Sequence, residues 1–141
     1  MKNTILLFTI IILFTNCSKD EDEPNNSKTY TTIVGNTYSA KSNKSYNSRD
    51  AYLIYKMNTN GTISQEIRFD SSTGEIYQTM NGSYVYNYPS LELTVQHSID
   101  LCPDCFNNFT ATVDNNFKSF SYTVFDLSTG TNKELLFNII E

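Results

Sequence analysis

Residues 51–95 decide the fold of this chain, and they divide into seven segments: AYLIYKM (51–57), NTNG (58–61), TISQEIRF (62–69), DSSTG (70–74), EIYQTMNGSYVY (75–86), NYPS (87–90) and LELTV (91–95). Four of these segments alternate apolar and polar residues. A period of two predicts β-strands, because successive side chains of a strand point to opposite faces. The short segments between them contain residues that tolerate positive φ, which tight hairpin turns require. The stretch therefore predicts a β-meander.

The alternating pattern continues on both sides of this stretch. Upstream, Thr31–Ala40 is the first strand candidate, and the polar segment Lys41–Asp50 connects it to the meander. Downstream, turns are expected at Asp114–Asn116 and Ser128–Gly130, which gives about eight strands in all. No interval between turns leaves room for the crossover helices that parallel strands need, so the sheet should be antiparallel. The apolar faces comprise Leu53, Tyr55, Met57, Ile63, Ile67, Phe69, Leu91, Leu93 and Val95, and downstream Phe109, Ala111, Val113, Phe120, Tyr122, Val124, Leu135, Phe137 and Ile139.

The first 16 residues have the pattern of a secretory signal peptide, so they are excluded from the fold. Lys2 supplies a positive charge, and the apolar run Ile5–Phe14 follows it. This run is too short to span the hydrocarbon core of a bilayer, which takes about 20 residues of helix. A charged start before a short apolar run is typical of a signal that is removed from the mature protein.

Cys17 comes directly after this segment and precedes the polar run SKDEDEP (18–24). The arrangement resembles the processing site of bacterial lipoproteins. The resemblance implies that Cys17 becomes the acylated first residue of the mature protein, and two or more acyl chains anchor a protein stably to a membrane. Residues 17–28 would then form a lipidated, acidic, flexible tether, and residues 29–141 the folded domain.

The charged run just after the predicted lipidation site consists of Lys19, Asp20, Glu21, Asp22 and Glu23. It resembles the acidic signal that directs Bacteroidetes lipoproteins to the outer face of the outer membrane, where a receptor reads it. The resemblance implies an outer-membrane protein that faces the cell exterior. The alternative is a solvated linker without a signal function, because carboxylates among Pro, Asn and Ser residues do not fold.

Four short motifs give the folded domain a family resemblance of its own. They are Val34-Gly35-Asn36-Thr37-Tyr38, Met57 ahead of Asn60-Gly61-Thr62, Gly82-Ser83-Tyr84, and Leu91-Glu92-Leu93-Thr94. In this order they resemble the lipocalin-like domains of Bacteroidetes lipoproteins. The resemblance implies an all-β fold in which a single up-and-down antiparallel meander closes into a small lipocalin-like barrel of about eight strands.

Charge and residue types argue against nucleic-acid binding and against catalysis. The net charge is −5, and Lys and Arg nowhere form the basic stripe that a phosphate backbone requires. His97 is the only histidine, and Ser98 beside it would point to the opposite face of a strand. No carboxylate pair of the glycosidase kind is discernible either, because the candidates mostly fall at outward or turn positions. We therefore expect no enzyme activity and no cofactor.

Cys102 and Cys105 form a Cys-Pro-Asp-Cys motif between two predicted strands. In an exported protein this spacing favours a structural disulfide. A redox-active pair is one alternative, but such a pair normally lies at a helix N-terminus, and no helix is predicted here. A zinc site that includes His97 is another, but structural zinc takes four N or S ligands, so we predict no metal.

Tyr84 and Tyr86 share one strand face, and Tyr55 would join them inside a closed sheet. An eight-stranded barrel has an interior that side chains alone can fill or that holds one small ligand. The candidate ligand-binding residues are accordingly Tyr55, Tyr84, Tyr86 and His97. We expect a non-catalytic protein that is bound to the membrane through its lipid anchor. It would bind a small molecule or support a neighbouring outer-membrane uptake complex, and the alternative is a solid-core structural or protein-interaction module.

Overall fold

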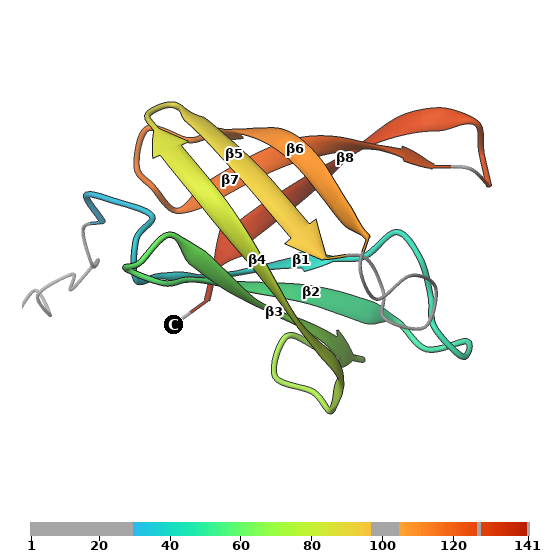
Figure 1. Cartoon of the computed structure of the whole chain (residues 1–141). Coiled ribbons are helices and arrows are strands. Elements are labelled where there is room, and N and C mark those ends of the chain that lie inside the picture. The colour runs from blue at the N-terminus through green and yellow to red at the C-terminus, as the bar shows by residue number, and fades with distance from the viewer. Residues whose placement is uncertain (1–29, 97–104, 127, 141) are drawn as a thin grey trace, which may run out of the picture.

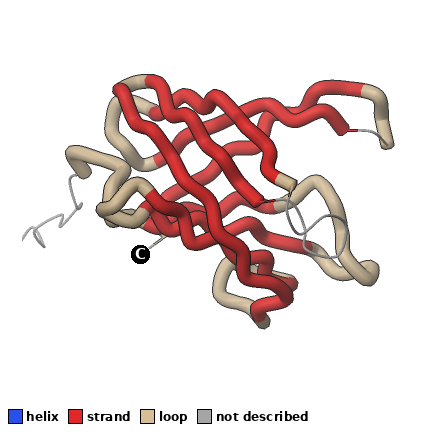
Figure 2. Tube along the Cα trace, in the orientation of Figure 1, coloured by secondary structure: helices blue, strands red, loops and turns tan. Residues whose placement is uncertain are grey.

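Eight strands follow one another along the chain and close into a barrel in which each strand pairs with its sequence neighbours (Figure 1). The computed structural model describes residues 30–96, 105–126 and 128–140. All pairings are antiparallel, including the pairing of the first strand with the last. Strands account for most of the described chain (Figure 2), so the predicted closed antiparallel meander is confirmed. The strands are β1 (Thr37–Lys41), β2 (Ala51–Met57), β3 (Thr62–Phe69), β4 (Ile76–Asn87), β5 (Ser90–Gln96), β6 (Phe106–Val113), β7 (Ser119–Asp126) and β8 (Thr131–Ile139).

Two strands, β2 and β3, begin and end where the alternation predicts, but β1 does not. The expected strand was Thr31–Ala40, whereas β1 covers Thr37–Lys41. Gly35 precedes the strand with a φ of 81°, and its amide donates to the carbonyl of Met57 at 2.6 Å. A positive φ interrupts an extended chain. The segment before β1 therefore turns across the end of the barrel, where the side chain of Ile33 is completely buried.

The two ends of the barrel differ in which connections they carry. We call the end with the β2–β3, β4–β5 and β6–β7 turns the closed end, and the end with the β1–β2, β3–β4 and β7–β8 connections the open end. The chain enters and leaves the barrel at the closed end, where the Ile140 amide donates to the carbonyl of Thr37 at 2.9 Å. In Figure 1 this end is on the left, with the C-terminus and the start of the described chain.

Aromatic rings fill the barrel interior near the closed end. Phe120 and Phe137 stack with centroids 4.8 Å apart and an interplanar angle of 8°. Tyr55 stacks on Phe137 at 4.7 Å, and Tyr38 meets Phe120 edge to face at 5.1 Å. All four side chains are at most 1% exposed. Such ring pairs add to the stability that burial of their large apolar surfaces already gives, so this half of the interior is a packed core.

The ladders between neighbouring strands are unequal in length. Seven residue pairs join β2 to β3 and β5 to β6, and eight join β7 to β8. Only Thr112↔Ser121 and Val113↔Phe120 join β6 to β7, and both pairs lie next to the closed end. Beyond them β6 and β7 diverge toward the open end (Figure 1). The β1–β8 ladder also has only two pairs, Tyr38↔Ile139 and Ser39↔Asn138. Two seams of the barrel wall are thus short of backbone hydrogen bonds within the described residues, and at the β6–β7 seam both strands continue well beyond the paired residues.

Candidate functional site

A cavity of about 280 Å³ occupies the open end of the barrel. Its walls are largely apolar side chains from six strands, and its mouth is lined by the polar β1–β2 connection. Because the aromatic core fills only the other half, the interior is packed at one end and hollow at the other. The lining residues are Leu53, Tyr55, Ile67, Val95, Phe109, Tyr122, Val124, Phe125 and Leu135 on the walls and Asn43, Lys44, Ser45, Tyr46 and Asn107 at the mouth.

Two tyrosines mark the boundary between the cavity and the packed core. The hydroxyl oxygens of Tyr55 and Tyr122 are 3.0 Å apart, and both side chains are buried. Burial raises the pKa of Tyr122 to about 12 and that of Tyr55 well above its ordinary value, so both phenols are protonated at neutral pH. Their mutual hydrogen bond uses only one of the two hydroxyl protons. The second proton is available to a water or a ligand.

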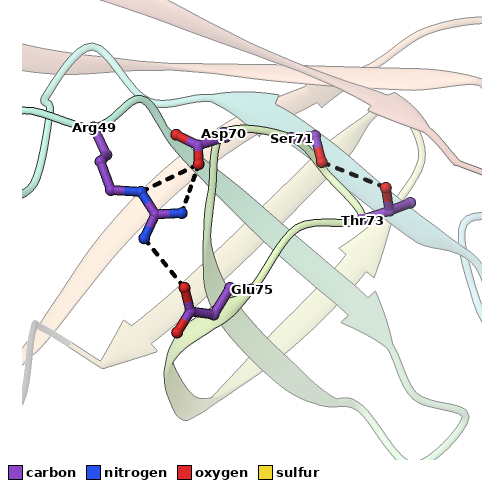
Figure 3. A network of polar contacts seen from close by, with 5 residues as sticks. All are labelled: Arg49, Asp70, Ser71, Thr73 and Glu75. Atoms are coloured by element: carbon purple, nitrogen blue, oxygen red, sulfur yellow. Dashed lines mark hydrogen bonds and ion pairs between the residues drawn. The ribbon is translucent and has the colours of Figure 1, made fainter.

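Arg49 holds the cavity mouth in place through ion pairs (Figure 3). Its Nη2 lies 2.5 Å from Oδ2 of Asp70, and its Nη1 lies 3.1 Å from Oε2 of Glu75. The guanidinium also lies over the ring of Phe69, 4.3 Å from the centroid. Arg49 and Tyr46 bond through their backbone amides and carbonyls in both directions. The connection that carries Tyr46 to the cavity is therefore tied to the β3–β4 hairpin.

The ion pair between Arg49 and Asp70 shifts the pKa of both side chains. The hydrogen bond from Arg49 lowers the pKa of the Asp70 carboxyl, and the two carboxylates in turn raise the pKa of Arg49. Arg49 therefore keeps its charge and is already neutralised by Asp70 and Glu75. Lys44 is the cation among the lining residues.

Asp126 is a buried carboxylate that directly follows the cavity-lining residues Val124 and Phe125. Its Oδ2 accepts a hydrogen bond from Nζ of Lys133 at 2.6 Å, and Ser128 donates to Oδ1 from both its hydroxyl and its amide. These bonds, that from Lys133 first, hold the pKa of the carboxyl far below its usual range. A fully paired carboxylate is a poor proton acceptor. It stabilises the end of the β7–β8 hairpin instead.

The structure brings one of the predicted ligand-binding tyrosines to the cavity and leaves two away from it. Tyr55 lines the cavity, as expected. Tyr84 and Tyr86 lie near the closed end, where the Tyr84 hydroxyl donates to the carbonyl of Asn58 at 2.6 Å. The buried Tyr86 hydroxyl has no hydrogen-bond partner among the described residues. The shared strand face was predicted, but it does not place these two rings at the cavity.

Several predicted sites lie outside the described residues. They are Cys17, the charged run Lys19, Asp20, Glu21, Asp22 and Glu23, and also His97 and Cys102. Cys105 is described and is disulfide-bonded. Its expected pairing with Cys102 stays a prediction, because that partner lies in residues 97–104.

Sequence reasoning missed one polar side chain in the barrel interior. Gln65 occupies a position between Ile63 and Ile67 on the inward face of β3, and it is only 5% exposed. Its Oε1 has no hydrogen-bond partner within the described part of the chain. Gln65 pairs with Tyr55 across β2 and β3. The signal was present, since a polar residue interrupts an otherwise apolar face.

Comparison with known proteins gives no relative from which a function could be transferred. No protein-family model, curated protein or solved structure matches this chain. Among residues 30–96, 105–126 and 128–140, no group of three His, Cys, Asp or Glu side chains could hold a metal ion. No helix in the same residues has the length and apolar character needed to cross a membrane.

Proposed function

We propose that this chain is a non-catalytic binding protein whose cavity takes up the apolar part of a small molecule. The observation that carries the proposal is the divided interior. Stacked rings such as Phe120 and Phe137 fill the half near the closed end, whereas the half near the open end holds a cavity of about 280 Å³. A solid structural barrel would gain stability from filling that space, because interiors normally pack densely.

The lining indicates the kind of ligand. Aliphatic and aromatic walls favour an apolar body, and the amine of Lys44 with the amides of Asn43 and Asn107 favours a polar or anionic end at the mouth. Sites for drug-sized molecules usually enclose about 300–1,000 Å³. A cavity slightly below this range suits a smaller ligand, such as a medium-chain carboxylate.

We also propose that the barrel is anchored through Cys17 to the outer membrane and faces the cell exterior. Tyr30 lies 13 positions after Cys17, so the tether reaches at most about 45 Å. The described chain begins at the closed end, opposite the cavity (Figure 1). An anchor on that side keeps the tether away from the cavity mouth and lets the cavity face away from the bilayer, where a ligand from outside the cell can enter.

Two sets of variants test the anchor and the export signal separately. Cys17→Ala should abolish fatty-acid labelling and leave an unprocessed precursor. Replacing Asp20, Glu21, Asp22 and Glu23 together by Ala should keep the lipid but reduce protease accessibility on whole cells. Acylation of the Cys17 variant would refute the anchor, and unchanged surface exposure of the second variant would reduce the acidic run to a linker.

A melting-temperature comparison of octanoate with octanol tests the cavity. Both compounds should raise the melting temperature, and octanoate should do so more because of Lys44. Lys44→Gln should remove the difference between the two. Val124→Trp should fill the cavity and cancel both shifts, whereas the same change at Val85, which is 60% exposed on the outer surface, should leave them intact. No shift for the unmodified protein would contradict the proposal.

A further inference from the structure

The cavity reaches the β7 backbone beside the gap between β6 and β7, because two successive residues of that strand line it. Val124 and Phe125 are successive residues of that strand, so their side chains point to opposite faces. Phe125 is 59% exposed, yet both residues line the cavity. The cavity therefore borders the backbone of β7 at these two residues. It does so where the ladder between β6 and β7 is missing.

Within the described residues, both edges of this gap carry backbone groups without ladder partners. The amide of Asp114 donates to the carbonyl of Ser119, so Asp114 and Ser119 are a hydrogen-bonded pair of the antiparallel ladder. This pair determines which residues of each strand direct their backbone groups toward the other strand. By alternation, the amides and carbonyls of Asn108 and Thr110 on β6 point toward β7. Those of Thr123 and Phe125 on β7 point back toward β6 by the same rule. The register would oppose Asn108 with Phe125 and Thr110 with Thr123, but neither pair forms.

Side chains, rather than backbone bonds, hold the two strands together at the inner limit of the gap. The rings of Phe109 and Tyr122 stack across it with centroids 4.5 Å apart and an interplanar angle of 24°. Phe109 lies between Asn108 and Thr110 on β6 and faces inward. An apolar group placed beside it therefore lies in the cavity.

We propose that the unpaired edge of β6 is a docking site for an extended peptide segment. The segment adds backbone hydrogen bonds to Asn108 and Thr110 and places one apolar side chain beside Phe109, in the cavity. The inference rests on the proposed function, since it takes the cavity as the binding site of an apolar group. It adds that this group is a side chain of an extended peptide.

The chemistry of the edge selects a peptide over a lipid. Amides and carbonyls that lack ladder partners among the described residues, at every second position, match the repeat of an extended chain, which pairs through alternate residues and presents side chains to alternate faces. Asn108, Thr110 and Thr123 on the two edges of the gap have uncharged side chains, so the gap itself provides no site for an anionic headgroup. Lys44 lies instead on the β1–β2 connection at the cavity mouth. A lipid chain would leave the edge groups of β6 to water.

The chain supplies a probe with a known register. A capped peptide with the sequence of Thr123–Asp126, TVFD, would oppose β6 with its Thr123 and Phe125 positions and direct its Val124 position into the cavity. It omits Ser119–Tyr122, because β7 itself already occupies that stretch of the β6 edge. Binding to the intact mature protein is measured by titration, together with amide hydrogen exchange. We expect the peptide to slow exchange at Asn108 and Thr110, while the amides of Phe109 and Ala111, which pair with β5, change little.

Modified peptides test the backbone and side-chain contributions separately. N-methylation at the Thr123 or Phe125 position should abolish binding, whereas N-methylation at the Val124 position should be tolerated, because that amide points away from β6. Glycine at the Val124 position should weaken binding roughly tenfold, as expected for loss of a buried apolar side chain.

The outcomes separate this inference from the proposed function. If octanoate binds but the peptide neither binds nor protects Asn108 and Thr110, the peptide site is refuted and the cavity proposal stands. If neither compound binds, both are refuted. Equal affinity of the peptides with the N-methyl group at the Thr123, Val124 and Phe125 positions would also refute the peptide site. Protection that grows with protein concentration alone would assign the edge to a second copy of this chain and overturn the peptide proposal.

Discussion

The hydroxyl groups of Tyr55 and Tyr122 meet inside the barrel at 3.0 Å, although the two residues lie 67 positions apart in the sequence. Both rings stack on Phe137, with centroids 4.7 and 5.3 Å away. The same two tyrosines line the cavity. They thus belong to the packed core through their rings and to the cavity surface through their hydroxyl groups, so they connect the stability of the barrel to its proposed function.

Removing both hydroxyls of this pair should cost less stability than the two single removals added together. Tyr55→Phe or Tyr122→Phe leaves a buried hydroxyl without its partner, and each should lower the free energy of unfolding by about 1–3 kcal/mol. The double variant has no orphaned group and should lose less than the sum. Urea unfolding of the unmodified protein, the two single variants and the double variant measures the coupling energy between the hydroxyls. Tyr88→Phe is the control, because that side chain is 53% exposed. Additive losses would show that the hydroxyls do not interact.

The buried tyrosines should make the barrel unstable in strong alkali. Burial raises the pKa of Tyr38 and of Tyr122 from 10.0 to about 12. The unfolded chain therefore loses these protons at a lower pH than the folded one. Stability should be unaffected by these groups below pH 10 and should fall as the pH rises toward 12. Tyrosinate absorbance and urea midpoints across this range check the result, and a flat stability profile would contradict it.

Asp126 should make the stability of the barrel depend on pH in acid, as the buried tyrosines do in alkali. Its pKa is lowered by Lys133 and Ser128, so its stabilising effect is present above its ordinary value of 3.8 and is lost as the pH falls below it. Asp126→Asn should be less stable than the unmodified protein at pH 7, and the two should converge as the solution is acidified. Asp50→Asn, in an exposed ion pair with Lys41, is the matched control. A constant difference at every pH would refute this account.

Gln65 should respond to substitution in a way that tells a structural role from a binding role. Its unpaired Oε1 costs desolvation energy, so Gln65→Met, which is similar in length and apolar, should raise the free energy of unfolding by about 1–3 kcal/mol. If octanoate binding is unchanged, the amide has no part in uptake. A stability loss in this variant would mean that the oxygen has a partner. Thermal unfolding and octanoate titration supply both readouts.

Alternation along the chain was enough to predict the meander, because each strand buries alternate side chains. β2 and β3 have the predicted bounds, and Gly82 allows the close approach of β4 to β5, since a Cβ there would lie 2.5 Å from the carbonyl oxygen of Thr94. Alternation reports which face a side chain occupies, but not how far along the barrel it lies. Tyr55 and Tyr84 therefore looked equivalent, although only Tyr55 lines the cavity.

The gap between β6 and β7 could not be predicted either. Each strand has a regular apolar pattern of its own, and the turn from Asp114 to Phe117 gives no sign of how far the ladder continues. Ladder length depends on how the whole sheet twists and closes, which is a long-range property. The ion pairs of Arg49 are similar, since Asp70 and Glu75 come near it only once the barrel has formed.

The most direct test of the central claim is to locate a bound ligand by NMR. With octanoate added to methyl-labelled protein, we expect nuclear Overhauser effects from the octanoate chain to the inward-facing methyl groups that line the cavity. None should reach Val85 and Leu136, which are exposed on the outer surface. Effects confined to those two outer residues, or no effects at all, would contradict an apolar binding cavity. The expected set is Leu53, Ile67, Val95, Val124 and Leu135.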